Sequence, residues 1–288
     1  MSALTPHVAL VPDSPSVSIA RVTAVAAAIQ KQVTRDFGPT WHVNATVDAF
    51  ENLEAVPVDY WPVIIRDDIN QPGAAGFHTD NHGQPFSLVQ ADPGWELTAS
   101  HETLEMLADP FGNRTIAGSP PPGAPAPVSQ FSRVLYLVEV CDPCEANSFA
   151  YEVNGVELSD FITPHYYDPA GAKGVQYSFR GNIKMPHTVL EAGYVSFGNP
   201  VDNHWYQIIV QKGKPSIRDL GIIKTTKGKS LRELVDAKVR EKRKDEYYRI
   251  KAPVTAKIAR VAMESPSPLA DSSSARAKLL RGYIKGLK

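Results

Sequence analysis

Apolar residues recur at helical spacing in two stretches of the first half of the chain. In residues 18–37 they return every three to four positions, Ser16 or Ser18 offers an N-cap, and Gly38-Pro39 is a stop signal. A second stripe ends before Pro110 and consists of Trp95, Leu97, Leu104 and Leu107 or Ala108. The pattern therefore predicts one amphipathic helix over residues 18–37 and another that ends near Pro110.

Between these helices the pattern changes to the alternation and the short apolar runs that are typical of strands. Residues 41–47 alternate, residues 60–65 form an apolar run, and residues 76–89 form two apolar segments around turn residues 81–83. From residue 134 to about residue 210 the chain has mainly short strand and turn patterns. This mixture predicts an α+β fold.

The chain has 288 residues, of which 43% are hydrophobic and 21% charged, enough for one large domain with an extension. Its net charge of −1 conceals an uneven distribution of charged residues along the chain. Residues 224–288 contain 18 Lys/Arg and 7 Asp/Glu, whereas the remainder contains 12 and 24. We therefore expect a domain over residues 1–223 and a basic, partly helical extension over 224–288. In it, a capping box at Ser230 and Glu233 predicts a helix to about Arg249.

The basic extension leaves its partner open. A positive segment binds nucleic acid, an acidic membrane surface or a partner protein, and charge alone does not choose among them. Alternatively, it packs back on the acidic body, because opposite net charges attract. The sequence has no 18-residue apolar run, and its first residues lack the basic and apolar parts of a secretory signal. The expected location is therefore the cytoplasm of a bacterium or of its phage.

The second predicted helix carries the sequence His-Glu-x-x-Glu at residues 101–105. Residues four apart on a helix lie on one face about 6 Å from each other, so His101 and Glu105 could hold one metal ion. Glu102 lies one residue along and is placed to act on a water at that ion. A solvated helix with one histidine near its start could have the same sequence motif. The apolar stripe and the sharp stop of this helix favour the metal site instead.

A third ligand must come from elsewhere, since a catalytic zinc ion usually takes three protein ligands. Glu139 is the expected donor, because it lies in an apolar run that otherwise has little reason to carry a carboxylate. Asp142 is expected to hydrogen-bond His101 and to fix its tautomer. The alternative for Glu139 is a glutamate at a strand edge that pairs with an arginine such as Arg133.

Two other residues compete for the place of third ligand. Asp109 lies eight residues after His101, about 12 Å along a helix, so it is expected instead to accept backbone hydrogen bonds in the turn at Pro110. His165 could ligate the ion, or could with Tyr166 donate a hydrogen bond to a developing oxyanion.

His78 and His82 suggest a second metal site, but their position around a turn favours exposed loop histidines. Cys141 and Cys144 are the only cysteines. One pair cannot complete a four-cysteine zinc site, and the sequence after them indicates a turn rather than the helix start of a redox motif. The remaining interpretations are two thiols packed beside the site or an optional disulfide.

The two motifs together resemble those of zincin metallopeptidases. The helix motif followed by Pro110, and then Glu139-x-x-Asp142-x-Cys144, is similar to elements of exordium-like, phosphate-induced proteins and related bacterial sequences, over about fifty residues. The resemblance implies a zincin-like domain with an N-terminal helix and a mixed sheet before the metal-binding helix. It also implies that the strand before this helix is the rim of a cleft, where a peptide substrate pairs by β-augmentation.

The function that follows from the resemblance is zinc-dependent hydrolysis of a peptide bond. His101, Glu105 and Glu139 would hold the zinc ion, and Glu102 would act as general base on a water activated by the metal. Two carboxylate ligands lower the Lewis acidity of the ion, so slow catalysis or a harder divalent metal is expected. The alternative is a non-catalytic binding or structural protein that uses its cleft edge and basic extension as contact surfaces.

Overall fold

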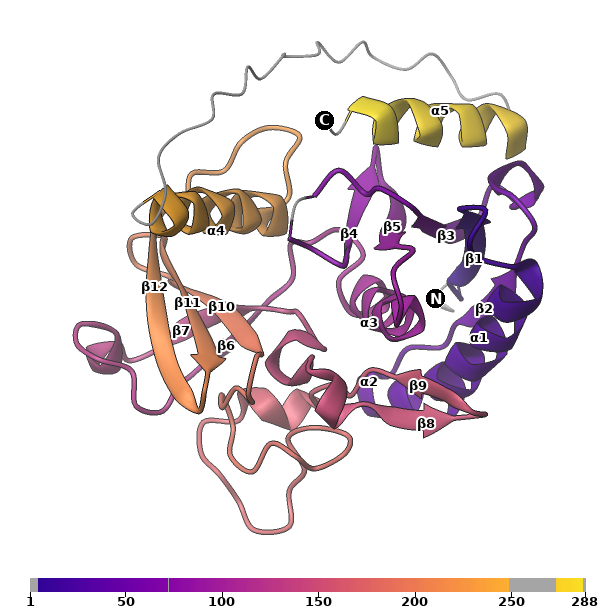
Figure 1. Ribbon diagram of the computed structural model, residues 1–288. Coiled ribbons are helices and arrows are strands. Elements are labelled where there is room, and N and C mark those ends of the chain that lie inside the picture. The colour runs from indigo at the N-terminus through magenta and orange to yellow at the C-terminus, as the bar shows by residue number, and fades with distance from the viewer. Residues whose placement is uncertain (1–4, 72, 249–272, 287–288) are drawn as a thin grey trace.

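The structure, a computed structural model, describes residues 5–71, 73–248 and 273–286. In these ranges the chain forms helices, two five-stranded sheets and a short hairpin (Figure 1). This confirms the α+β class. The helices are α1 (Ile19–Gln32), α2 (Gly38–Trp41), α3 (Trp95–Ala108), α4 (Leu231–Tyr248) and α5 (Ser273–Gly286).

The first sheet is mixed and has the strand order β2-β1-β3-β5-β4. Neighbouring strands are parallel except β4, which pairs antiparallel with β5 and lies at the edge. The strand over residues 60–65 and the hairpin over residues 76–89 are confirmed, whereas β1 was not predicted. The strands are β1 (His7–Asp13), β2 (Thr46–Ala49), β3 (Tyr60–Arg66), β4 (Gly76–Asn81) and β5 (Gln84–Gln90).

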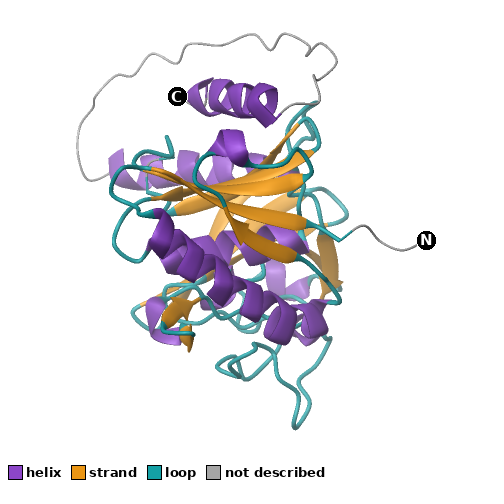
Figure 2. Cartoon of the chain, turned by 90° about the vertical axis from the view of Figure 1, so that its right-hand side faces the viewer, coloured by secondary structure: helices purple, strands orange, loops and turns teal. Residues whose placement is uncertain are grey.

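Alternation along these strands divides their side chains between two faces, each covered by helices (Figure 2). The first face packs against α1 and α3 and includes Val8, Leu10, Val63, Ile65 and Val89. The second face packs against α5 and includes Ala9, Val11, Ile64, Phe86 and Leu88. Helix α3 follows β5 directly along the chain, so the sheet positions the predicted motif helix.

The first helix begins as predicted but does not end as predicted. Ser18 caps α1 by accepting a hydrogen bond from the backbone N–H of Arg21 at 3.2 Å. At the expected stop the chain continues through a π-helical turn, Val33–Phe37, into α2. Pro39 is tolerated in the first turn of α2 because backbone N–H groups there have no partner within the helix, so the missing N–H of proline costs no hydrogen bond. This turn shortens the next predicted strand, which begins only at Thr46.

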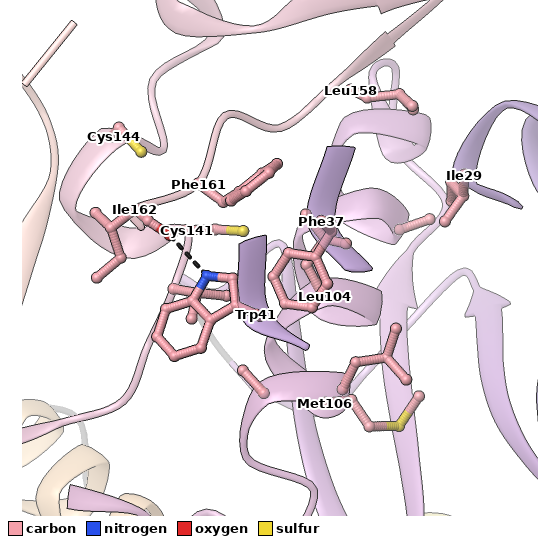
Figure 3. Packing of buried hydrophobic residues seen from close by; sticks show 14 of the residues in the cluster. Ile29, Phe37, Trp41, Leu104, Met106, Cys141, Cys144, Leu158, Phe161 and Ile162 are labelled. Carbon is pink, nitrogen blue, oxygen red and sulfur yellow. Dashed lines mark hydrogen bonds between the residues drawn. The ribbon is translucent and has the colours of Figure 1, made fainter. Parts of the chain in front are cut away.

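The extra turn places Phe37 and Trp41 in the main hydrophobic core, next to Leu104 of α3 (Figure 3). The Trp41 indole N–H donates to the carbonyl of Ile162 at 2.8 Å, and Phe37 makes an edge contact with Phe161. Through these contacts the segment that follows α1 packs against the residues around Phe161 and Ile162, and α3 lies in the same core.

The second sheet is antiparallel and has the order β12-β11-β10-β7-β6. The predicted strands near residues 194–197 and 205–210 are confirmed, whereas residues 176–179 contribute only an isolated bridge between Ile162 and Ser178. Its strands are β6 (Thr115–Gly118), β7 (Val134–Leu137), β10 (Tyr194–Asn199), β11 (His204–Gln211) and β12 (Lys214–Ile222). The hairpin consists of β8 (Tyr151–Val153) and β9 (Val156–Leu158).

Both described helices of the basic extension pack on the body. Helix α4 buries Val235 and Val239 against side chains of the second sheet, including Trp205. Helix α5 lies on the first sheet, where Arg281 pairs with Glu54 at 2.9 Å. These contacts agree with the alternative that the extension packs back on the acidic body. Over the described ranges, every helix is too short or too polar to cross a bilayer.

Candidate metal centre

Helix α3 is fixed in rotation by a polar contact deep in the core. It begins after Gly94, whose positive φ of 91° turns the chain from β5 into the helix. The Ser100 hydroxyl donates to the side-chain carbonyl of Gln32 at 2.8 Å and accepts from the Ser159 N–H at 3.1 Å. Because Ser100 is anchored in this way, the side chain of His101 is directed toward the segment after β7.

The His101 side of the centre contains the pair that the helix motif predicted. His101 Nε2 lies 3.3 Å from Glu105 Oε1 and 3.1 Å from Asp142 Oδ1. The expected contact between Asp142 and His101 is therefore present, but it uses the same ring nitrogen that faces Glu105. The donor atoms of His101, Asp142 and Glu145 also lie within 4.8 Å of one another. Asp142 thus occupies the position of a further ligand for an ion at His101.

Glu139 lies two residues beyond β7, with its side chain buried. Its carboxylate is within 4.8 Å of those of Glu105 and Asp142, so the structure brings the expected third donor to the motif helix. It also pairs with an arginine, as the alternative expected, but the partner is Arg232 of α4 at 2.9 Å.

Arg232 is the most unexpected member of the centre. Its Nη2 lies 3.2 Å from Glu105 Oε2, its Nη1 contacts both ring nitrogens of His78, and its side chain is only 8% exposed. Its Nε lies 3.9 Å from Asp236 on the same helix. The capping box predicted where this helix begins, but no signal in the sequence linked residue 232 to the motif helix.

His78 is buried, so the expectation of an exposed loop histidine is wrong for this residue. Alternation along β4 directs Phe77 toward the face under α5 and His78 toward α3. His78 Nδ1 lies 3.5 Å from Glu102 Oε2. His82 is exposed in the β4–β5 turn, as expected.

The remaining candidates lie outside the group of donors. Asp109 accepts hydrogen bonds from the backbone N–H groups of Asn113 and Arg114, at 3.1 and 2.7 Å, which is the structural role expected for it. His165 does not join the centre, because its side chain is 60% exposed and pairs with Asp168 at 2.8 Å.

Tyr166 is fully buried among aromatic rings rather than directed at the carboxylates, and it contacts Tyr136 and His187. The adjacent Tyr167 is the phenol that the centre affects: burial raises its pKa, and Glu139 raises it further. The Tyr167 hydroxyl has no hydrogen-bond partner among the described residues. Tyr167 therefore replaces Tyr166 as the nearby neutral donor.

The charges of the centre act strongly on one another. Burial lowers the pKa of His101, but Glu105 and Asp142 outweigh it and raise that pKa well above its usual value. Burial opposes ionisation of Glu105, yet His101 and Arg232 hold its pKa below the usual range. Burial, followed by the charge of Glu105, raises the pKa of Asp142 to about 6. Burial likewise raises the pKa of Glu139 well above normal despite Arg232.

The buried oxygens of the centre fit a cation. Six of them accept no hydrogen bond within the described part of the chain, and four of the six have an ion-pair partner, which is Arg232, His78 or His101. Burying carboxylate oxygens without hydrogen bonds is costly. A divalent ion would satisfy such oxygens, and an imidazole with several carboxylates suits zinc or a harder ion such as Mn²⁺. The oxygens are Glu102 Oε2, Glu105 Oε2, both of Glu139 and both of Asp142.

Cys141 and Cys144 are both buried free thiols within the main hydrophobic core (Figure 3). The backbone N–H of Cys141 donates to Glu105 Oε1 at 3.2 Å, and its thiol contacts the carbonyl of His101 at 3.8 Å. Of the two expectations for this pair, the structure shows thiols packed beside the site.

No protein-family model, curated protein or solved structure matches the chain. The resemblance to zincins therefore depends on the motif residues of this chain, and functional inference depends on the geometry of the centre.

Proposed function

We propose that the protein is a metal-dependent peptidase with a zincin-like domain, in which His101, Glu105 and Glu139 hold a divalent ion. The observation that carries this proposal is that the donor atoms of Glu105, Glu139 and Asp142 lie within 4.8 Å of one another, with His101 Nε2 3.3 Å from Glu105. Buried oxygens of this group accept no hydrogen bond among the described residues. Asp142, 3.1 Å from His101 Nε2, is a fourth donor. This set is richer in carboxylates than a two-histidine site, so we expect Mn²⁺ to compete well with Zn²⁺.

The order of elements supports the zincin-like part of the proposal. An N-terminal helix, a mixed sheet and a hairpin precede the motif helix α3, as the resemblance implies. The strand β4 is the end member of the described sheet and carries His78 of the centre. An extended peptide that paired along this edge would therefore lie beside the proposed metal ligands.

A divalent ion at this centre would supply Lewis acidity, by polarising a carbonyl and lowering the pKa of a water molecule. A donor atom of Glu102 lies within 4.8 Å of the ligand Glu105, and Glu102 Oε2 accepts no hydrogen bond in the described structure. It is therefore placed to accept a proton and to return it to the leaving amine. His78, 3.5 Å from that oxygen, orients the carboxylate, and Tyr167 offers a neutral hydroxyl to the developing oxyanion.

The first test is the metal content of purified protein, measured by mass spectrometry after reconstitution with Zn²⁺ or Mn²⁺. We expect about one ion per chain from the ligand count. His101→Ala should lose the ion, and Glu139→Ala should bind it more weakly. Glu96→Gln is the control, because Glu96 is also on α3 but pairs with Arg21 near the surface. Absence of bound metal from the reconstituted wild type would overturn the ligand assignment.

The second test separates catalysis from binding. Glu102→Gln should abolish hydrolysis of a peptide library while the metal content stays unchanged, because Glu102 is not among the proposed ligands of the ion at His101. The competing function is a non-catalytic protein that contacts its partners through the β4 edge and the basic helices. Arg232 favours this alternative, since it already supplies positive charge to Glu105 and Glu139. Equal turnover by wild type and Glu102→Gln would contradict the peptidase mechanism.

A further inference from the structure

Glu105 separates the centre into two lobes. Its Oε1 faces His101 Nε2 at 3.3 Å and accepts a hydrogen bond from the Cys141 N–H at 3.2 Å. Its Oε2 lies 3.2 Å from Arg232 Nη2 and 3.7 Å from His78 Nδ1. The two oxygens of one carboxylate therefore serve different neighbours, and the second lobe is distinct from the metal position at His101.

The second lobe has the composition of a cation site. The donor atoms of His78, Glu102 and Glu105 lie within 4.8 Å of one another, and all three residues are buried. Glu139 borders the same lobe, because its Oε2 lies 2.9 Å from Arg232 Nη2. Three carboxylates thus lie within 3.9 Å of the guanidinium, those of Glu105, Glu139 and Asp236. Glu102 adds a further negative charge nearby.

The guanidinium of Arg232 satisfies this lobe only in part. Glu102 Oε2, Glu105 Oε2 and both oxygens of Glu139 are buried and accept no hydrogen bond among the described residues. Arg232 is therefore close enough to compensate charge but is not aligned to occupy these lone pairs. A metal ion can bind a carboxylate oxygen without the alignment that an N–H donor requires.

Arg232 is delivered to the lobe by a well-anchored helix start. The capping box forms, with Ser230 N–H donating to Glu233 at 2.8 Å and Glu233 N–H donating to the Ser230 hydroxyl at 3.1 Å. The Arg232 N–H donates to the carbonyl of Gly112 at 2.9 Å, and the preceding N–H donates to the Asn113 side chain at 2.9 Å. The charge is thus a fixed part of the centre.

We propose that the second lobe is a built-in site for a divalent cation, which the wild-type chain fills with the guanidinium of Arg232. Its donors are His78, Glu102 and Glu105, and Glu139 lies at its border. The centre then takes one divalent ion at His101, where it would otherwise take two that share Glu105, as in two-metal hydrolases. The expected number of one ion per wild-type chain rests on the proposed function. The assignment of the second lobe as a cation site does not rest on it.

The test compares the number of Mn²⁺ ions bound per chain, by native mass spectrometry and isothermal titration calorimetry with MnCl₂. Arg232→Ala should bind one ion more than the wild type, because a positive charge and its volume leave the lobe. Lys238→Ala is the matched control, since it removes a positive charge from the same helix at a surface pair with Glu241. It should bind the same number as the wild type.

A second substitution locates the additional ion. Adding His78→Ala to Arg232→Ala should remove the extra ion, and an extra ion that persisted would overturn the assignment of this lobe. A folded Arg232→Ala protein that binds no more Mn²⁺ than the wild type would also overturn the proposal. If Arg232→Ala does not fold, Arg232→Met refolded with MnCl₂ fills the volume without the charge, and the same count decides.

The outcomes distinguish this proposal from the proposed function. If the wild type binds no ion and Arg232→Ala binds one, the ion at His101 fails while the second lobe stands. If the wild type binds one ion and Arg232→Ala also binds one, the second lobe fails while the proposed function stands. In the doubly loaded variant, the electron paramagnetic resonance spectrum should show two Mn²⁺ ions coupled through Glu105.

Discussion

Gly76 is the residue that gives Glu102 its place at the crossing of β4 and α3. A Cβ at position 76 would lie 2.7 Å from Thr98 Cγ2 and 2.9 Å from both Cγ and Oε1 of Glu102. The absence of a side chain therefore lets the edge strand approach the proposed general base closely. A single methyl group added at position 76 would therefore crowd the Glu102 side chain.

We predict that Gly76→Ala displaces the Glu102 carboxylate and reduces turnover at least about tenfold, a barrier change of about 1.4 kcal/mol. The metal content should not change, because the Cβ would meet Glu102 and Thr98, and neither residue is among the proposed ligands of the ion at His101. Peptide hydrolysis and metal content would be measured on the same preparation. Gly282→Ala is the control, since a Cβ there meets no atom within 4 Å. Full activity in Gly76→Ala would show that Glu102 needs no such room.

Asp109 allows a structural role to be separated from a ligand role. Because its carboxylate accepts two backbone hydrogen bonds in the turn after α3, we predict that Asp109→Ala lowers the free energy of unfolding by about 2 kcal/mol. The number of ions per folded chain should remain that of the wild type. Urea denaturation and metal analysis would check both, and loss of the ion from well-folded protein would return Asp109 to the list of ligands.

At the scale of elements, the turn between α3 and β6 holds the start of α4. Gly112 in this turn has a φ of 59°, and a Cβ there would lie 3.0 Å from both the Arg232 Cβ and the Ser230 Oγ. The same residue accepts the hydrogen bond from the Arg232 N–H. The position of Arg232 in the centre therefore depends on a glycine more than one hundred residues earlier.

We predict that Gly112→Ala loosens the docking of α4 and increases amide hydrogen exchange over residues 231–239 at least about tenfold, a local change of about 1.4 kcal/mol. Gly228→Ala is the matched control, because Gly228 also has a positive φ, of 77°, but a Cβ there meets no atom within 4 Å. Both variants carry the backbone strain, whereas only Gly112→Ala pushes against the helix. Equal exchange in the two variants would contradict this steric reason.

Elements whose signals are local could be predicted from the sequence. Helices α1, α3 and α4, strand β3 and the β4–β5 hairpin follow from periodicity, caps and turn residues. Strand β1 was not predicted, although its apolar run at residues 8–11 is of the same kind as the run that predicted β3, and both strands lie between two parallel neighbours. The end of α1 was wrong because Pro39 lies in a first helical turn, where proline is tolerated.

The centre shows the same limit. The spacing of His101 and Glu105 fixes their contact, since both lie on one helix. The contact between His78 and Arg232 joins residues 154 positions apart, through the packing of an edge strand against a helix of the other sheet. No local pattern contains that information, so the positive charge inside the centre could be found only from the fold.

At the scale of the whole molecule, α5 covers the second face of the first sheet and raises the question of what holds the extension there. Ala277, Leu280 and Ile284 are buried against the sheet, and the Tyr283 ring makes an edge contact with Phe86. Arg281 pairs with Glu54 at 2.9 Å, but its side chain is 35% exposed. Opposite net charges bring the two parts together, whereas apolar burial has the larger energy once they are in contact.

We therefore predict that Leu280→Ala lowers the free energy of unfolding by about 2–4 kcal/mol, because it leaves a cavity between α5 and the sheet. Arg281→Ala removes two partly exposed ion pairs on the same helix, with Glu54 and Asp13, and should cost under about 1 kcal/mol. Urea denaturation at low and high salt would compare them. A larger loss for Arg281→Ala, or a stability that falls steeply with salt, would show that charge rather than burial holds the extension. The expected order instead makes the Arg281 ion pairs secondary to apolar burial in the docking of α5. The buried Arg276 donates to the carbonyls of Pro57 and Tyr60, whereas Lys278 and Lys285 face solvent.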